Sequence, residues 1–146
     1  GRLYQWCGAM DATISERSRG ICPAGWHVPS DCEWMYLEHG QGMSIAFQTT
    51  NNAWRANDAD NQGTPGYKLR SVGTGQTNAS GFSGLLAGRR NTDGPFLYRT
   101  SDGFWWSSSA TGAATASDRY LNTGTRGVNR YSSNKANGFS VRCLKD

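Results

Sequence analysis

The chain has little of what membrane proteins, nucleic-acid-binding proteins and zinc proteins usually show. No apolar run in its 146 residues approaches the length of a membrane span, and the N-terminus lacks the basic and apolar regions of a signal peptide. The net charge of +4 is spread over arginines rather than gathered into a basic stretch, so nucleic acid is not indicated. CxxC pairs and His/Cys clusters are also absent, which argues against zinc.

Glutamate, glutamine and methionine are missing from Thr77 to Asp146, although the first 76 residues contain all three. Glutamate is ordinarily among the commonest residues, so the gap needs a cause. One cause is a half of the chain that is rich in sheet and loop, because all three residues favour helices. A second cause depends on a family resemblance that other motifs carry.

Groups that could perform catalysis are few. His27 lies in a predicted turn and His39 in the last turn of a predicted helix, so we expect structural roles for both. Asp93, Asp102 and Asp118 could offer carboxylate oxygens to a hard cation. However, the EPN, QPD and WND triplets of calcium-dependent sugar-binding lectins are absent. We therefore expect no enzyme, no cofactor and no metal site.

Aromatic and small polar residues dominate what is present. Six Trp, six Tyr and five Phe can build one core in a chain of 146 residues. Nineteen Gly, with many Ser, Asn and Thr, predict long irregular connections. We therefore expect one loop-rich α+β domain over residues 1–146.

The sequence of the first half predicts two helices and a long irregular segment. Residues 6–10 place Trp, Ala and Met at the spacing of one face of a short helix. A capping box that begins at Ser30 predicts a second helix over about 31–39, ended by a glycine. Residues 41–76 are then predicted to be mostly irregular, with a short strand near 67–72.

The second half mixes framework positions with polar runs. Trp105 and Trp106 are large enough to anchor a core, and the alternation Phe-Val-Cys over 139–143 is typical of a half-buried strand. Polar runs such as 111–115 and 131–134 have too few apolar side chains to build a core. We expect the framework to be buried and the polar runs to be exposed.

Four cysteines, at positions 7, 22, 32 and 143, allow three pairings. Disulfides are favoured, and they indicate an oxidising compartment; the alternative is four buried free thiols in a cytosolic protein. A start at Gly1 without Met is typical of a trimmed product, so the missing signal peptide says little about location. We expect an extracellular or cell-surface protein, which includes a protein of a virus particle.

Three groups of motifs carry a family resemblance. They are GICPAGWHVPSDCEW at 20–34, TNASGFSGLLAGRRNTDG at 77–94, and FWWSSS at 104–109 with GFSVRCLKD at 138–146. In this order, and with an opening YQWCGAM, they closely resemble the Fibrobacter succinogenes major paralogous domain family. The resemblance implies a C-type-lectin-like fold, in which two helices flank a small, mostly antiparallel sheet, the termini pair as strands and long irregular loops carry the binding face.

The second half is also similar to the members of this family that serve as variable proteins of diversity-generating retroelements. There, adenines of a template are randomised, so that AAY codons become NNY codons, which cannot encode Glu, Gln, Lys, Met or Trp. This would explain the missing residues and would make about 89–137 a hypervariable region. The fixed frame matches in spacing, with two departures: Ala110 replaces an acidic residue and Ser117 an aromatic one.

Carried over position by position, the resemblance marks a set of residues as free to vary and therefore as ligand-binding. We call them the variable set: Leu97, Tyr98, Asp102, Phe104, Thr111, Gly112, Thr115, Asp118, Tyr120, Asn122, Thr125, Gly127, Asn129, Tyr131, Ser132, Ser133 and Asn134. Most of the binding energy is expected from its aromatic members, Tyr98, Phe104, Tyr120 and Tyr131. Aromatic side chains, tyrosine above all, offer a rigid contact surface at little entropic cost.

The resemblance has two further implications. It pairs Cys22 with Cys143, which leaves Cys7 to pair with Cys32. It also implies a ligand-binding module, for an unknown protein or surface ligand, whose surface is diversified on a fixed scaffold. The alternative is a structural or adhesion domain of a surface protein without diversified specificity.

Overall fold

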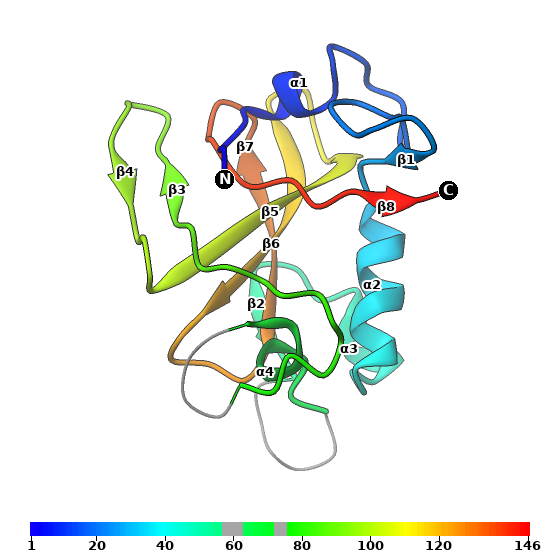
Figure 1. The fold of residues 1–146 in the computed structure, drawn as a ribbon, viewed down its shortest axis with the longest axis vertical. Helices are drawn as coiled ribbons and strands as arrows, with labels where there is room; N and C mark the ends of the chain where they lie inside the picture. Colours follow the sequence, from blue (N-terminus) through cyan, green and yellow to red (C-terminus); the bar gives the residue numbers. More distant parts are fainter. Residues whose placement is uncertain (57–62, 72–75) are drawn as a thin grey trace.

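Most of the regular structure is antiparallel sheet. The computed structural model describes residues 1–56, 63–71 and 76–146. Its largest sheet has four strands in the order β2 (Ala53–Arg55), β7 (Val128–Asn134), β6 (Thr115–Asn122) and β5 (Asp102–Ala110). Two smaller pairs are β1 (Trp26–His27) with β8 (Leu144–Lys145), and β3 (Arg89–Arg90) with β4 (Phe96–Leu97) (Figure 1).

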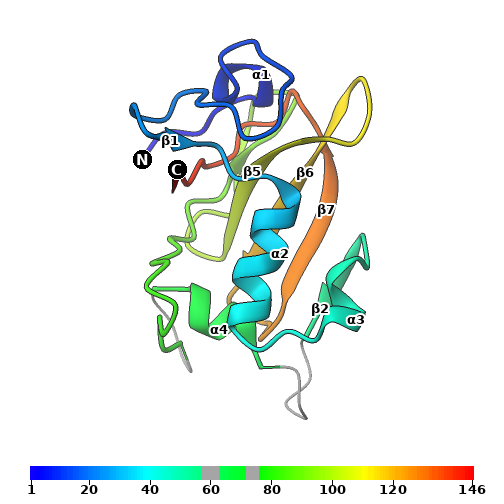
Figure 2. The same cartoon turned by 90° about the vertical axis from the view of Figure 1, so that its right-hand side faces the viewer.

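The helices are few and mostly short. Within the described ranges they are α1 (Trp6–Ala9), α2 (Asp31–Gly40), α3 (Ile45–Gln48) and α4 (Pro65–Leu69). Figure 2 shows α2 running along one face of the large sheet. Two helices flanking the sheet are not seen, because α1 is a single turn. None of these helices has the length and apolar character that a membrane span requires.

The long helix begins where its capping box predicts. The Ser30 hydroxyl accepts a hydrogen bond from the Glu33 backbone N–H at 3.2 Å, and the Glu33 carboxylate accepts one from the Ser30 N–H at 2.9 Å. Each side chain therefore satisfies a backbone donor of the first turn. The prediction of a helix over about 31–39 is confirmed, with Gly40 as its last residue rather than the residue after it.

The segment 41–76 contains more regular structure than predicted. The prediction of a strand near 67–72 is wrong for residues 67–69, because residues 65–69 form α4. Residue 72 lies outside the described ranges. Pro65 occupies the first turn of α4, where its fixed φ and its missing N–H suit a helix start. Gly66 lies so close to the β6–β7 turn that an added Cβ would be 2.2 Å from the Gly127 carbonyl oxygen.

Two hydrophobic clusters hold the elements together, and alternate residues of β5 enter each of them. The first contains Trp6, Ala9, Met10, Cys22, Val28, Phe104, Trp106, Ala116 and Phe139. The second contains Trp34, Met43, Ala56, Leu69, Phe82, Leu86, Trp105, Leu121 and Val128. The predicted burial of Trp105, Trp106 and Phe139 is confirmed, whereas Val141 is only half-buried.

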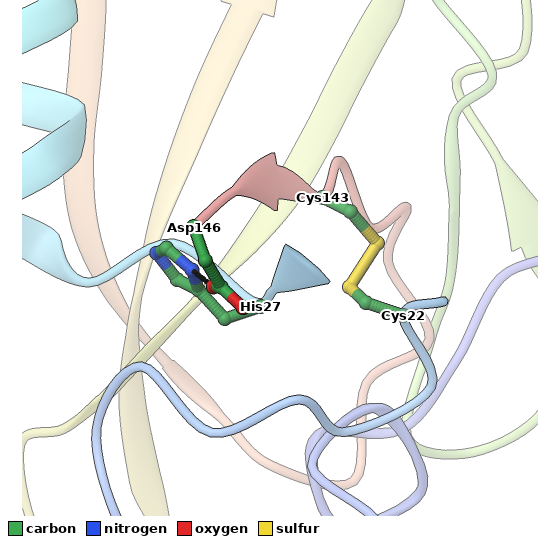
Figure 3. Close-up of a disulfide and its surroundings, with 4 residues drawn as sticks. All are labelled: Cys22, His27, Cys143 and Asp146. Atoms are coloured by element: carbon green, nitrogen blue, oxygen red, sulfur yellow. Dashed lines mark hydrogen bonds and ion pairs between the residues drawn. A yellow bond between two sulfur atoms is a disulfide. The ribbon is translucent and has the colours of Figure 1, made fainter. Parts of the chain in front are cut away.

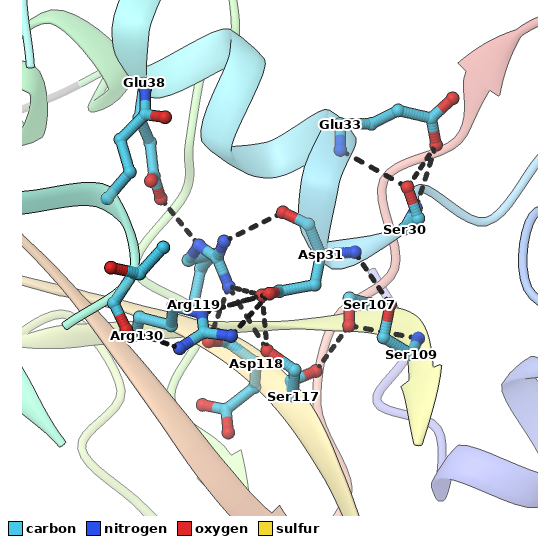
Figure 4. Close-up of polar contacts among 12 residues, drawn as sticks. Ser30, Asp31, Glu33, Glu38, Ser107, Ser109, Ser117, Asp118, Arg119 and Arg130 are labelled. Atoms are coloured by element: carbon cyan, nitrogen blue, oxygen red, sulfur yellow. Dashed lines mark hydrogen bonds and ion pairs between the residues drawn. The ribbon is translucent and has the colours of Figure 1, made fainter. Parts of the chain in front are cut away.

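A buried ionic network joins α2 to the sheet (Figure 4). Arg119 of β6 is fully buried and donates to Asp31 at 2.7 Å and to Glu38 at 2.5 Å. Arg55 of β2 makes two hydrogen bonds to Glu38, each 2.8 Å long. Arg130 of β7 donates to Asp31 at 2.6 Å. We call these five residues the α2 network; they tie both ends of the helix to three strands.

The carboxylate of Asp31 is held in its charged form. Burial alone would raise the pKa of Asp31. Hydrogen bonds from Arg130, Ser117 and Arg119, together with the charge of Arg119, outweigh burial and hold the pKa well below its usual range. The α2 network is therefore ionic at neutral pH.

A disulfide between Cys22 and Cys143 confirms one predicted pairing (Figure 3). It joins the segment before β1 to the segment before β8, across a sequence separation of 121. Beside it, the buried ring of His27 contacts Asp146 at 2.6 Å through Nδ1 and Glu33 at 3.1 Å through Nε2. His27 thus has a structural role in holding the last strand, as expected from its place in the sequence.

The predicted bridge between Cys7 and Cys32 is wrong, since both thiols are free and exposed. Helix α1 turns Trp6 and Ala9 toward the core, so Cys7, which follows Trp6, faces solvent. Helix α2 turns Asp31 and Trp34 inward, which likewise leaves Cys32 outward. Each cysteine lies on the solvent side of its own helix.

The disulfide arrangement predicts a simple result in peptide mapping. Alkylation of the native protein without reductant should label Cys7 and Cys32, and digestion should return one linked pair, Cys22 with Cys143. Mass spectrometry of the alkylated digest measures this directly. A peptide linking Cys7 to Cys32, or label on Cys22, would contradict the structure.

Loss of Arg119 should destabilise the fold strongly. Replacing Arg119 with Ala leaves Asp31 and Glu38 with fewer partners in a buried site, for which we expect a loss of about 3 to 5 kcal/mol in the free energy of unfolding. Urea unfolding measures it. The exposed Arg99 is the control, because Arg99→Ala should change stability by about 0.5 kcal/mol or less. Equal losses in the two variants would show that the network does not hold α2 in place.

Candidate functional site

The two faces of β6 carry different kinds of residue. Successive side chains of a strand point to opposite faces. Arg119 and Leu121 face α2, where they meet the ionic network and the second cluster. Asp118 and Tyr120 therefore face the other way, and Figure 4 shows Asp118 pointing away from the network. The face opposite α2 is where side chains of the variable set gather.

A pocket of about 290 Å³ opens on this opposite face. Its walls come from β3, the β4–β5 connection and the three long strands. The lining residues are Arg89, Tyr98, Phe104, Asp118, Tyr120, Asn129, Tyr131 and Ser133. All of them except Arg89 belong to the variable set. Residues that are up to 35 positions apart in that set are thus brought together by strand pairing, for example Phe104 with Tyr120 and Tyr120 with Asn129.

Aromatic rings form most of the pocket wall. Phe104 and Tyr120 are stacked, with ring centroids 4.6 Å apart and an interplanar angle of 6°. Trp54 packs on the Tyr120 ring at 4.7 Å, and Tyr98 lies 6.5 Å from Phe104. Two of the four aromatic residues expected to dominate binding, Tyr98 and Tyr131, are exposed at about half of their surface (50% and 46%). They can meet a ligand directly.

Hydrogen bonds fix the phenol of Tyr120. Its Oη donates to Asp102 Oδ1 at 2.5 Å and accepts from Asn122 Nδ2 at 3.2 Å. Burial and the bond to Asp102 raise the pKa of Tyr120 to about 12, so the phenol is neutral at physiological pH. Tyr120 and Asn122 therefore share one side of β6 while Leu121 is buried on the other, as the alternation in the sequence predicts.

Asp118 is the buried charge-bearing group of the pocket. Asp118 is 1% exposed. In the sheet it lies opposite Trp106 of β5 on one side and opposite Tyr131 of β7 on the other. Burial raises the pKa of Asp118 to about 7, against a hydrogen bond from Ser133 and the positive charges of Arg119 and Arg89. Near neutral pH this carboxyl therefore exists in both protonation states.

Arg89 is the lining residue that the sequence did not predict. Its guanidinium lies 5.3 Å from the ring centroid of Tyr98 and 5.4 Å from that of Phe104. The one available signal was its place at the start of the predicted hypervariable region, next to Arg90 in the GRRNTDG motif. Arg90 instead pairs with Gly138, so the two arginines have separate roles.

The rest of the variable set lies outside the pocket. Leu97 is in β4, Asn122 ends β6 and Asp102 supports Tyr120 from the start of β5. The β5–β6 hairpin, the β6–β7 turn and β7 hold the others: Thr111, Gly112, Thr115, Thr125, Gly127, Ser132 and Asn134. Ser132 contacts Thr111 rather than the pocket.

The variable set is not wholly exposed, and the predicted exposure of the polar run 131–134 fails at Ser133, which is buried. Six members are buried: Asp102, Phe104, Asp118, Gly127, Asn129 and Ser133. Five of them lie on long strands, where neighbouring strands and aromatic rings cover them. Phe104 also stacks on Phe139 at 5.1 Å and belongs to the first hydrophobic cluster. Its contribution is therefore to the floor of the pocket rather than to an exposed contact surface.

A second, apolar groove of about 520 Å³ lies near the disulfide. It is lined by residues that include Trp26, Trp34, Phe82 and Cys143, and by no member of the variable set. Over the described ranges, no group of three His, Cys, Asp or Glu side chains is placed to hold a metal ion. The pocket of about 290 Å³ is thus the one lined by residues that the sequence predicted to bind a ligand.

Comparison with known families decides what kind of domain this is. Residues 1–145 match the Fibrobacter succinogenes major domain. The chain belongs to this family. No curated protein and no solved structure matches the chain. The family match spans α2, the ionic network, both cysteines of the disulfide and the pocket, so all of these lie within one family domain.

Asp118 should make stability depend on pH near neutrality. The folded state keeps the Asp118 proton up to about pH 7, whereas the unfolded chain loses it near 3.8. Raising the pH between these values therefore favours unfolding, by about 1.4 kcal/mol per pH unit at most. The free energy of unfolding of the wild-type protein, relative to that of Asp118→Asn, should fall from pH 5 to pH 7 and stay constant above pH 7.

Urea unfolding of both proteins at pH 5, 6, 7 and 8 measures this difference. The exposed Asp93 is the matched control, because Asp93→Asn should differ from wild type by the same small amount at every pH. A pH-independent difference between wild type and Asp118→Asn would mean that Asp118 titrates as it does in the unfolded chain.

Proposed function

We propose that this domain is a ligand-binding module whose binding surface is varied on a fixed scaffold, in the manner of the variable proteins of diversity-generating retroelements. The observation that carries the proposal is the pocket: residues marked by the sequence pattern meet at one site although they come from the β4–β5 connection and three strands. The loss of Glu, Gln and Met from residue 77 onward supports the same history.

The scaffold in this proposal has a C-type-lectin-like fold. Three features support it: the long helix on an antiparallel sheet, the pairing of Tyr4 with Phe139 and of β1 with β8 near the two ends, and the long connections between them. Figure 2 shows both ends of the chain on the same side of the molecule.

Fixed and variable residues alternate along the same strands. Arg119, Leu121 and Val128 face the α2 network and the second cluster, whereas Asp118, Tyr120 and Asn129 face the pocket. A change on the pocket side can therefore leave the α2 side unaltered. This arrangement favours a binding surface that can change without loss of the fold.

The proposed activity is binding rather than catalysis. The pocket lining contains neither histidine nor cysteine, and Asp118 is its one carboxylate. The exposed tyrosines at its rim are typical of surfaces that recognise proteins. The disulfide between Cys22 and Cys143 supports an extracellular or cell-surface location, including a virus particle.

Exchanging the two rim tyrosines should change the ligand and keep the fold. Asn, like Tyr, is encoded by NNY codons, and it suits position 98, where φ is +62°. We therefore expect Tyr98→Asn with Tyr131→Asn to keep the free energy of unfolding within about 1 kcal/mol. Peptides selected by phage display on the wild-type domain should bind this double variant at least about ten-fold more weakly, since contact tyrosines commonly carry more than 1.4 kcal/mol.

Tyr36 provides the matched control, because it is 81% exposed on α2 and is not part of the pocket lining. Tyr36→Asn should leave peptide affinity unchanged in biolayer interferometry. Unfolding of the double variant, or equal affinity of the selected peptides for it and for the wild type, would refute the assignment of the binding surface.

A further inference from the structure

The pocket contains buried polar atoms that no described residue satisfies. They are Asp118 Oδ1 and Asn129 Oδ1, which are acceptors, and Arg89 Nε, which is a donor. The Asp118 and Asn129 residues are 1% and 8% exposed. Leaving a buried polar group unpaired destabilises a fold, so such groups usually have a partner. Three such atoms around one pocket offer a ligand hydrogen bonds that no side chain of the described residues makes.

The two acceptors lie on neighbouring strands and face the same side of the sheet. Asp118 is directly opposite Tyr131, and Asn129 is two residues before Tyr131 on β7. Diagonal neighbours of this kind are roughly 7 to 8 Å apart at Cα, and their side chains can converge on one bound group. A group with several N–H donors in a fixed arrangement can reach both oxygens at once.

The walls favour a positive charge. Tyr98 and Tyr131 are about half exposed and offer their rings to a bound group, whereas Phe104 and Tyr120 stack on each other and on Phe139 and Trp54. Ring faces attract ammonium and guanidinium groups, most strongly where water is excluded. The guanidinium of Arg89 already packs at 5.3 and 5.4 Å from two of these rings, which shows that the wall accommodates such a group.

We propose that the pocket binds the guanidinium or ammonium end of an arginine or lysine side chain presented by a protein partner. This inference rests on the proposed function and names the chemistry of the ligand at the same site. The volume of about 290 Å³ is near the lower limit of small-molecule sites and suits one side chain. Asp118 and Asn129 accept its hydrogen bonds, and the rings enclose its apolar stem.

An anionic ligand fits the same pocket less well. It would accept a hydrogen bond from Arg89 Nε, but it would leave Asp118 Oδ1 and Asn129 Oδ1 without a donor. The pocket thus has two unpaired acceptors and one unpaired donor. The charge of Arg89 opposes a second cation, and the carboxylate of Asp118 offsets that charge when it is deprotonated. The balance of donors and acceptors therefore favours a ligand that mainly donates.

Cation binding should be coupled to the protonation of Asp118. The groups that act on this carboxyl are Ser133 of β7, Arg89 of β3, Arg119 of β6 and Asp31 of α2. Because the pKa of Asp118 is about 7 in the empty pocket, a cation that needs the carboxylate displaces its proton. Affinity should rise with pH up to about 7 and stay level above it.

The test uses n-butylguanidinium as the probe and n-butylurea as its neutral isostere. Titrations of the wild-type domain are followed by NMR shifts of the backbone amides of β6 and β7. At pH 8 we expect the cation to bind at least ten-fold more tightly than the urea, and its affinity to fall by up to ten-fold per pH unit below 7. Asp118→Asn should lose both the preference and the pH dependence, whereas Asp93→Asn should keep them.

A second variant keeps the inference testable if Asp118→Asn does not fold. Arg89→Gln removes the cation that opposes the ligand, so it should tighten binding of n-butylguanidinium. Equal binding of urea and guanidinium, tighter binding of n-butylphosphonate, or no binding of the cation at pH 8 would each overturn the inference. The proposed function fails separately, when selected peptides ignore the exchange of Tyr98 and Tyr131.

Discussion

The burial of one guanidinium constrains the whole structure. Removing the charge of Arg119 from water costs several kcal/mol, and the fold can offset this only by placing Asp31 and Glu38 beside it. Helix α2 must then lie along β6. Because side chains alternate along a strand, an inward Arg119 also requires Asp118 and Tyr120 to point outward. A slip of one residue would place Asp118 against Glu38, so the ionic network also fixes which side chains of β6 face the pocket.

Local signals in the sequence predicted part of this arrangement. The capping box at Ser30 fixed the start of α2, and the size of Trp105 and Trp106 identified core residues, because both effects depend on neighbours in sequence or on side-chain volume alone. The helix α4 was missed: its start depends on Pro65, and its position depends on a turn more than fifty residues away.

Long-range features of the site were harder to predict for the same reason. The variable set follows from codons and spacing, which carry no information on burial, so the burial of Asp118 and Asn129 could not be predicted. Arg89 reaches the pocket only because β3 lies beside the start of β5, a contact that no local pattern reports. The free thiols of Cys7 and Cys32 likewise follow from the orientation of two helices and not from the number of cysteines.

The covalent link between Cys22 and Cys143 also determines how the domain would carry mechanical load. A force pulling these two positions apart passes through the sulfur–sulfur bond, and the residues between them, which include the large sheet and the pocket, bear none of that tension. Only the parts outside the closed loop, such as α1, would be drawn out first. The pocket would therefore keep its shape while the parts of the chain outside the closed loop are stretched.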